Sequence, residues 1–263
     1  DYSLGGITLL CKFDGQRVTM ASQIAGADET VSSLYSVKSE QATMLSFDTY
    51  NYLVHYFGQP QGSMADDPNG TLGGDYEFVI SDATADRIEL KGKKYGNRIV
   101  MKAFSADQTW KQYLTRIKKV EDDAFFYEYD LRMDGLYTGQ MLRSNYTFIV
   151  TYYDEVGKVH QKTVPFMFTT DGMRFHEPVT IDGQTMQNFV WKNEEISFVC
   201  TDEGATEVKL AGVYTAGYQS YDYYPGTYQM DFYRLNDATN QMEVASQEIQ
   251  LVKDEDGKSY WLK

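Results

Sequence analysis

The stretch from Leu45 to Met101 constrains the fold more than any other part of this chain. Several of its segments alternate apolar and polar residues, and residues typical of turns separate them. A period of two places apolar side chains on one face of a strand, and antiparallel sheets commonly bury one face and expose the other. The stretch therefore predicts antiparallel β structure, and it contains no catalytic signature.

Tyrosine and phenylalanine support this interpretation, because they favour the pleated, half-buried surface of a sheet. The chain has 22 Tyr and 14 Phe among its 263 residues. A chain of this length can form one large β domain or two ordinary ones.

Turn chemistry places the individual strands. Asp14-Gly15 separates two apolar runs and predicts a hairpin. DYEFVI, RIELKGKK and NRIVMKAF predict a three-stranded meander, and LSFDTYNYLVHYF predicts a further extended segment. The second half continues with the same pattern, with Asp171-Gly172 and Asp182-Gly183 as turns.

One segment predicts a helix. Ser105 and Gln108 have the spacing of a capping box, and the spacing predicts a helix over 107–120. Its apolar positions recur at the intervals of one helical face. These positions are Trp110, Tyr113, Leu114, Ile117 and Val120.

We therefore expect a mainly β protein. An antiparallel meander or lipocalin-like half-barrel over residues 1–104 precedes a linking α-helix over 105–121. A second antiparallel β unit, either a sandwich or another half-barrel, covers 122–263. One continuous domain remains an alternative.

Charge excludes one large class of partner. The formal net charge is −14 and the isoelectric point is about 4.6. A field of this sign repels phosphate backbones, so we expect no nucleic-acid binding. It also disfavours adsorption on anionic lipid.

The residues that commonly hold metals do not cluster in the sequence. His55, His160 and His176 are far apart, and Cys11 and Cys200 lie in separate apolar runs. We expect the cysteines to be small buried residues, with a disulfide between them as the alternative. We predict no metal site and no cofactor.

Two acidic segments offer an alternative to that prediction. Asp66, Asp67 and Asn69 could suggest a cation, but an Asp-Pro-Asn-Gly turn explains them without one. Asp254 and Asp256 resemble a fragment of a calcium loop, although a hairpin turn explains them as well.

Catalytic motifs are missing from the sequence. It has neither a GxSxG motif nor a phosphate-binding glycine loop before a helix. Asp48, Glu77 and Glu177 are conceivable members of a carboxylate pair for glycoside hydrolysis, but 38 acidic residues make such candidates easy to find.

The strongest candidate binding feature is a tyrosine cluster that runs into Pro225-Gly226. Its members are close in sequence and hard to bury together, so they can form an exposed shelf that stacks on a sugar ring or contacts a protein. A strand whose tyrosines lie on both faces of a sheet edge is the alternative. The predicted ligand-binding residues are Tyr214, Tyr218, Tyr221, Tyr223 and Tyr224.

Several phrases of the chain resemble an uncharacterised lipoprotein family of Bacteroidetes, domain-of-unknown-function family 4302. They are GGITLLCKFDGQRVTM, LSFDTYNYLVHYF, GGDYEFVI, IELKGKKYGNRIVM and PFMFTTDGMRF with the following VTIDG. The resemblance covers residues 5 to 195 well and the remainder less well. None of these phrases corresponds to a known active site.

The resemblance implies a lipoprotein precursor anchored in the outer membrane through an N-terminal lipidated cysteine. We expect that cysteine to lie upstream of Asp1, since Cys11 lies inside a predicted strand. Members of the family are encoded near SusC- and SusD-like nutrient-uptake proteins, which makes those proteins, or a glycan, the expected partners.

Three functions are consistent with these observations. The first is a non-enzymatic accessory surface lipoprotein that binds a nutrient or a partner protein of an outer-membrane uptake system. The second is a lipocalin-like carrier of a small apolar ligand in the first half. The third is a hydrolase acting through paired carboxylates.

Overall fold

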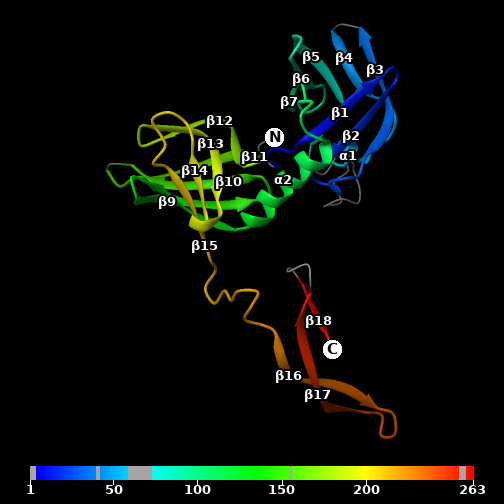
Figure 1. Ribbon diagram of the computed structural model, residues 1–263, viewed down its shortest axis with the longest axis vertical. Coiled ribbons are helices and arrows are strands. Elements are labelled where there is room, and N and C mark those ends of the chain that lie inside the picture. The colour runs from blue at the N-terminus through cyan, green and yellow to red at the C-terminus, as the bar shows by residue number, and fades with distance from the viewer. Residues whose placement is uncertain (1–3, 40–41, 59–72, 155, 255–258) are drawn as a thin grey trace. The chain divides into compact units, whose positions relative to one another are not determined.

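The structure is a computed structural model that describes residues 4–39, 42–58, 73–154, 156–254 and 259–263. The described residues are mainly β and confirm the predicted fold class (Figure 1). They form a curled seven-stranded sheet, a closed eight-stranded barrel and a small three-stranded sheet. The chain divides into two compact units, Asp1–Val213 and Tyr214–Lys263.

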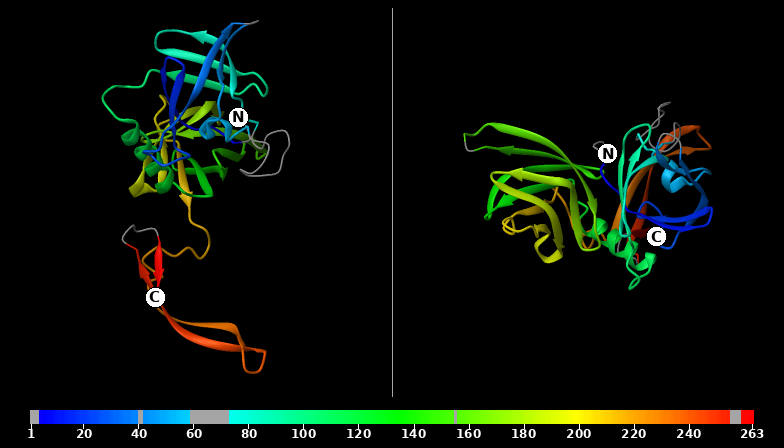
Figure 2. Two further views of the ribbon diagram at one scale, coloured as in Figure 1. Left: turned by 90° about the vertical axis from the view of Figure 1, so that its right-hand side faces the viewer. Right: turned by 90° about the horizontal axis from the view of Figure 1, so that it is seen from above.

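The first sheet is an antiparallel meander in which each strand pairs with the next one in the chain. The predicted Asp14-Gly15 hairpin and the three-stranded meander are both confirmed. The sheet curls strongly, as its blue to cyan strands show in Figure 2. Its strands are β1 (Leu9–Asp14), β2 (Arg17–Ser22), β3 (Val31–Ser39), β4 (Thr43–Phe47), β5 (Glu77–Ala83), β6 (Arg87–Gly92) and β7 (Arg98–Lys102).

The extended segment predicted beyond Phe47 is wrong, because a short helix, α1 (Tyr52–His55), follows β4. Asn51 caps this helix, and its side chain accepts a hydrogen bond from the amide of Leu53. Leu53 and Val54 are buried in the core of the first sheet. The two apolar residues therefore enter the core from a helical turn, where alternation suggested a strand.

A buried carboxylate holds the far end of the first sheet. The side chain of Asp75 accepts hydrogen bonds from the backbone amides of Lys94 at 2.7 Å, Tyr95 at 3.1 Å and Asn97 at 3.3 Å. The side-chain amide of Asn97 donates a further bond at 2.8 Å. A single side chain thus fixes the turn between β6 and β7.

The second sheet closes into a barrel, where the prediction placed a sandwich or a half-barrel. Closure comes from the antiparallel pairing of β15 with β8, which joins Lys209 to Arg132 and Val213 to Glu128. The strands are β8 (Glu128–Met133), β9 (Leu136–Ser144), β10 (Thr147–Tyr153), β11 (Val159–Phe168), β12 (Gly172–Ile181), β13 (Gln184–Lys192), β14 (Ser197–Cys200) and β15 (Lys209–Val213).

Strand β9 was missed by the sequence analysis. Asp134 and Gly135, both with positive φ, form the hairpin turn that precedes it. An Asp-Gly turn of this kind predicts a hairpin. The signal that would have identified β9 is therefore the same one that identified the first hairpin.

Large apolar side chains fill the interior of the barrel. Phe148 and Phe166 stack at 4.4 Å, and Tyr129 packs edge-to-face on Phe148. Cys200 is buried in this core, and both cysteines are free thiols. The other fully buried rings of the cluster are Phe168, Phe175 and Phe198.

Helix α2 (Trp110–Asp123) joins the first sheet to the barrel. Ile117 and Val120 belong to the core of the barrel, whereas Leu114 packs with Leu10 and Ala21 of the first sheet. The ammonium of Lys118 also donates to the carbonyl oxygens of Gln23 at 2.7 Å and Ala25 at 2.9 Å. The predicted apolar face of this helix thus contacts two sheets.

The predicted start of α2 is wrong by one turn. Thr109, not Ser105, is the N-cap, and it forms a reciprocal capping box with Gln112. The chain contains two successive patterns, Ser-x-x-Gln over 105–108 and Thr-x-x-Gln over 109–112. Only the second directly precedes the residues that are buried against both sheets. Tertiary packing therefore selected the cap.

The third sheet forms the second compact unit together with the segment 214–225. Its strands are β16 (Gly226–Asn236), β17 (Gln241–Lys253) and β18 (Tyr260–Leu262). In Figure 2, β16 and β17 form a long twisted hairpin, orange to red. The predicted C-terminal β unit over 122–263 thus contains both the barrel and this separate sheet.

No helix among the described residues is long and apolar enough to cross a membrane.

The capping box leads to a first prediction. Thr109→Ala should lower the free energy of unfolding by about 1 kcal/mol, because the amide of Gln112 loses its acceptor. Ser105→Ala is the matched control and should change it by less than about 0.5 kcal/mol. Urea denaturation measures both. A larger loss for Ser105→Ala would place the N-cap one turn earlier.

Asp75 leads to a second prediction. Asp75→Ala should cost roughly 2–4 kcal/mol of unfolding free energy, because several backbone amides lose their acceptor in a buried site. Asp86→Ala, at an exposed turn of the same sheet, should stay within about 0.5 kcal/mol of the parent. Equal effects of the two substitutions in urea denaturation would contradict the assigned role of Asp75.

Candidate functional site

The predicted tyrosines all lie in the segment that precedes β16, within the second compact unit. Two tight turns shape this segment, in which the amide of Tyr218 donates to the carbonyl of Thr215 and that of Tyr223 to the carbonyl of Ser220. Gly217, at a positive φ of 79°, allows the first turn. Proline at position 225 then ends the segment before the strand begins.

The tyrosines form two groups of rings. Tyr214 and Tyr218 stack on each other with ring centroids 4.3 Å apart. Tyr221 stacks on Tyr260 of β18 at 4.6 Å. Tyr224 meets Tyr260 edge-to-face at 6.3 Å, and Tyr223 meets Tyr224 edge-to-face at 5.3 Å. The structure therefore brings three of the five predicted residues together around Tyr260 and pairs the other two.

Hydrogen bonds hold the second group on the sheet. The hydroxyl of Tyr221 donates to the carbonyl of Ser259, and the hydroxyl of Tyr260 donates back to the carbonyl of Tyr221. The hydroxyl of Tyr228 donates to the carbonyl of Tyr224 at 2.6 Å. These bonds give a loop of aromatic residues a defined geometry before any ligand binds.

Exposure distinguishes supporting rings from available ones. Tyr223 is 62% exposed, Tyr218 53%, Tyr214 46% and Tyr224 41%. Tyr221 is only partly exposed, because it lies between Tyr260 and the ammonium of Lys253, which is 5.3 Å from its ring centroid. Tyr221 therefore serves as a support, and the other four rings offer apolar surface to a ligand.

A charged pair borders the second group. The ammonium of Lys253 forms a salt bridge with the carboxylate of Asp222. The hydrogen bond that Lys253 donates to the carboxylate of Asp222 raises the pKa of Lys253. Burial raises the pKa of Tyr260, with the neighbouring Tyr221 adding to the effect. Both groups thus keep their protons at neutral pH, and the site offers hydroxyl and ammonium donors beside the rings.

Sequence reasoning missed Tyr260, Tyr228 and Lys253. These residues lie on strands that pair with or follow the predicted segment, and only the hairpin brings them to it. Their signal in the sequence is weak, because each is a single residue in an alternating strand. Lys253 and Tyr260 are direct partners in the pairing of β17 with β18.

The three carboxylates considered for hydrolysis lie in the first compact unit. Asp48 accepts from Ser46 at 2.7 Å, and the neighbouring hydroxyls of Ser36 and Ser46 lower its pKa. Glu77 pairs with Lys93 at 3.1 Å, and Glu177 lies on β12 of the barrel. A lowered pKa suits a permanently ionised group rather than a general acid. Hydrolysis stays a prediction.

The histidines occupy three separate places. His55 of α1 stacks on Tyr76, which precedes β5. His160 contacts Asp154 at 2.9 Å at the end of β10, and His176 lies on β12. In the described part of the chain, no cluster of His, Cys, Asp and Glu suits a metal ion. Asp66, Asp67, Asn69 and Asp256 lie outside the described residues.

Comparisons with known proteins agree with the two units in part. Residues 1–193 match a domain of unknown function, DUF4302, and residues 201–263 match a second domain of unknown function, DUF4987. The first match covers the curled sheet, α2 and most of the barrel. The second begins within the barrel and includes every tyrosine of the candidate site. Searches of curated proteins and of solved structures found no match.

The site leads to a third prediction. Tyr221→Phe should increase amide hydrogen exchange in β18, because the bond to the carbonyl of Ser259 is lost while the ring remains. Tyr223→Phe is the matched control, since no bond from its hydroxyl is found among the described residues. Exchange followed by NMR at the amides of 260–262 tests this. Unchanged exchange in Tyr221→Phe would show that the hydroxyl does not hold the strand.

Proposed function

Because this chain belongs to the DUF4302 family, whose function is unknown, we propose a function from the chain's own site: it is a non-enzymatic surface protein that binds neutral glycans. The binding residues are Tyr214, Tyr218, Tyr223 and Tyr224 of the second unit, and Tyr221 supports them. In this proposal the protein is an accessory lipoprotein of an outer-membrane nutrient-uptake system, held at the cell surface by an N-terminal lipid anchor.

One observation carries the proposal: four exposed tyrosine rings gather in a short segment, and hydrogen bonds tie its second group of rings to the sheet. A sugar ring has an apolar C–H face surrounded by hydroxyls. Tyrosine matches this chemistry, because it combines an apolar ring with a polar tip. A site that is ordered before binding also loses less entropy when the ligand binds.

Charge favours a neutral ligand over an anionic one. The net charge of −14 repels polyanions such as nucleic acids and sulfated or uronic-acid-rich polysaccharides. Neutral sugars experience no such repulsion. Their hydroxyls can accept from Lys253 and donate to Asp222, the pair that borders Tyr221.

Contact with a partner protein is the second candidate, and a different surface favours it. The outer part of the β16–β17 hairpin exposes Tyr233, Leu235, Met242 and Val244. Tyr233 pairs with Val244, and Leu235 with Met242, so the four side chains share one face. An exposed apolar face of this kind is typical of a protein contact, and a SusC- or SusD-like protein is the expected partner.

The carrier hypothesis lacks comparable support. The first sheet, in which the carrier's ligand was expected, is open at β1 and β7. A carrier needs a ligand cavity of roughly 300 Å³ or more. We therefore place binding on the tyrosine surface.

The proposal leads to a fourth prediction. Tyr223→Ala should weaken glycan binding about tenfold, because roughly 1.4 kcal/mol of stacking is lost. The measurement is titration calorimetry with maltoheptaose, cellohexaose, xylohexaose and mannohexaose. Tyr233→Ala is the matched control: it removes a tyrosine from the same unit that is even more exposed, at 74%, but lies on the hairpin.

Both variants should melt at the temperature of the parent. Binding by Tyr223→Ala equal to that of the parent would remove the tyrosine surface as the site. A loss in Tyr233→Ala alone would move the site to the outer hairpin.

A further inference from the structure

The barrel wall opens between β11 and β12. Each strand has ten residues, but they pair only where Phe166, Met167 and Phe168 meet Phe175, Arg174 and Met173. Beyond Phe166 and Phe175 no pairing joins the two strands. The register of β12 with β13 also shifts between Arg174 and Val179, which marks a bulge on the same side. The two strands therefore separate over the remainder of their length.

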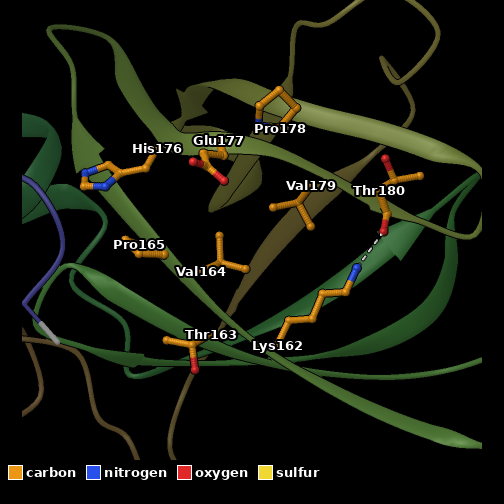
Figure 3. Close-up of a pocket in the computed structure, with 9 residues that line it drawn as sticks. All are labelled: Lys162, Thr163, Val164, Pro165, His176, Glu177, Pro178, Val179 and Thr180. Atoms are coloured by element: carbon orange, nitrogen blue, oxygen red, sulfur yellow. Dashed lines mark hydrogen bonds between the residues drawn. The ribbon is translucent and has the colours of Figure 1, made fainter. Parts of the chain in front are cut away.

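A pocket of about 290 Å³ fills this opening. Figure 3 shows it between the two walls. One wall is Lys162–Pro165 of β11, and the other is His176–Thr180 of β12. Val164 belongs to the core of the barrel, and Val179 packs against that core. The pocket therefore reaches the apolar interior through the gap in the wall.

The direction of the backbone groups on β11 follows from its pairing with β10. The amide of Phe166 donates to the carbonyl of Tyr146, and the amide of Asp154 donates to the carbonyl of Lys158. The direction of the backbone groups alternates from residue to residue along an antiparallel ladder. The backbone amides and carbonyls of the even-numbered residues of β11 therefore point towards β10. The amide and carbonyl of Thr163 thus point away from β10, into the opening.

The same reasoning applies to β12. Ile181 and Gln184 close a two-residue hairpin turn with β13, and such a closing pair is hydrogen-bonded. The backbone amide and carbonyl of Thr180 therefore point away from β13 and towards β11. Its carbonyl accepts a hydrogen bond from the ammonium of Lys162 at 3.1 Å, which crosses the opening. Figure 3 shows this bond. Both walls thus direct backbone groups into the opening, where these groups could pair with an added strand.

Opposite charges mark the two ends of the pocket. Lys162 lies beside Thr180 at one end, and Glu177 lies beside His176 at the other (Figure 3). Burial lowers the pKa of His176 to about 4, so its ring is neutral at pH 7. Arg174, the other charged side chain near His176, does not line the pocket. Among the residues that line the pocket, Glu177 therefore supplies a negative charge at one end and Lys162 a positive charge at the other.

We propose that this opening binds a short peptide with free ends, roughly three residues long, as an added strand between β11 and β12. The peptide backbone pairs with Thr163 and Thr180. A central apolar side chain packs on Val164 and Val179, and the terminal carboxylate and ammonium lie towards Lys162 and Glu177. This site is separate from the tyrosine surface and does not depend on it.

Amide hydrogen exchange of the full chain tests this proposal directly. The probe is the tripeptide Ala-Val-Ala with free ends, followed by NMR at millimolar concentration. Exchange at the amides of Thr163 and Thr180 should slow at least tenfold at saturation. Ala-Pro-Ala, which lacks the central amide, and Ala-Val-Ala with acetylated and amidated ends should each bind at least tenfold more weakly.

Matched variants locate the binding site. Thr163→Pro removes the backbone amide that pairs with the peptide and should abolish protection at Thr180. If Thr163→Pro does not fold, Val179→Trp replaces it, because the larger side chain fills the pocket and should exclude the peptide. Circular dichroism confirms that each variant is folded.

Three results would overturn the proposal. The first is slow exchange at Thr163 and Thr180 without peptide, which would show that the walls are already paired. The second is no protection by any peptide. The third is equal protection by the capped and the free tripeptide, which would remove the role of the charged ends.

Discussion

The pairing of backbone hydrogen-bonding groups is the constraint on which this structure depends. A buried amide or carbonyl without a partner is costly, so each sheet must either close or leave its edges where water can reach them. The barrel closes through the pairing of β15 with β8. The first sheet and the third sheet remain open. At the gap between β11 and β12, the wall of this barrel leaves backbone groups available for pairing with another strand.

Helix α2 makes one compact unit of the curled sheet and the barrel. A single apolar face would suffice for packing on one sheet, but Leu114 packs on the first sheet while Ile117 and Val120 pack on the barrel. Because one rigid element contributes to both cores, the two sheets lose contacts together if the helix shifts. The bonds from Lys118 to the carbonyls of Gln23 and Ala25 add a polar connection at the same place.

The two units use aromatic residues in opposite ways. In the barrel, Tyr129 and the phenylalanines around it are fully buried and supply packing energy. In the second unit, most tyrosines stay exposed, and hydrogen bonds from their hydroxyls hold the loop on the sheet. Exposed rings in a fixed geometry add little to the core, so their surface remains available for a ligand. The contrast supports placing binding in the second unit.

The sequence by itself determined the class of fold, most strands, the helix and the existence of a tyrosine-rich segment, because alternation, turn residues and helical spacing are local signals. It did not determine which sheet closes, which of two successive capping patterns starts α2, or that Leu53 and Val54 are helical. Nor did it bring Tyr260 and Lys253 to the tyrosines. Those features depend on pairing between distant segments, whose free energy is gained only when the whole sheet forms, and only the tertiary structure could decide them.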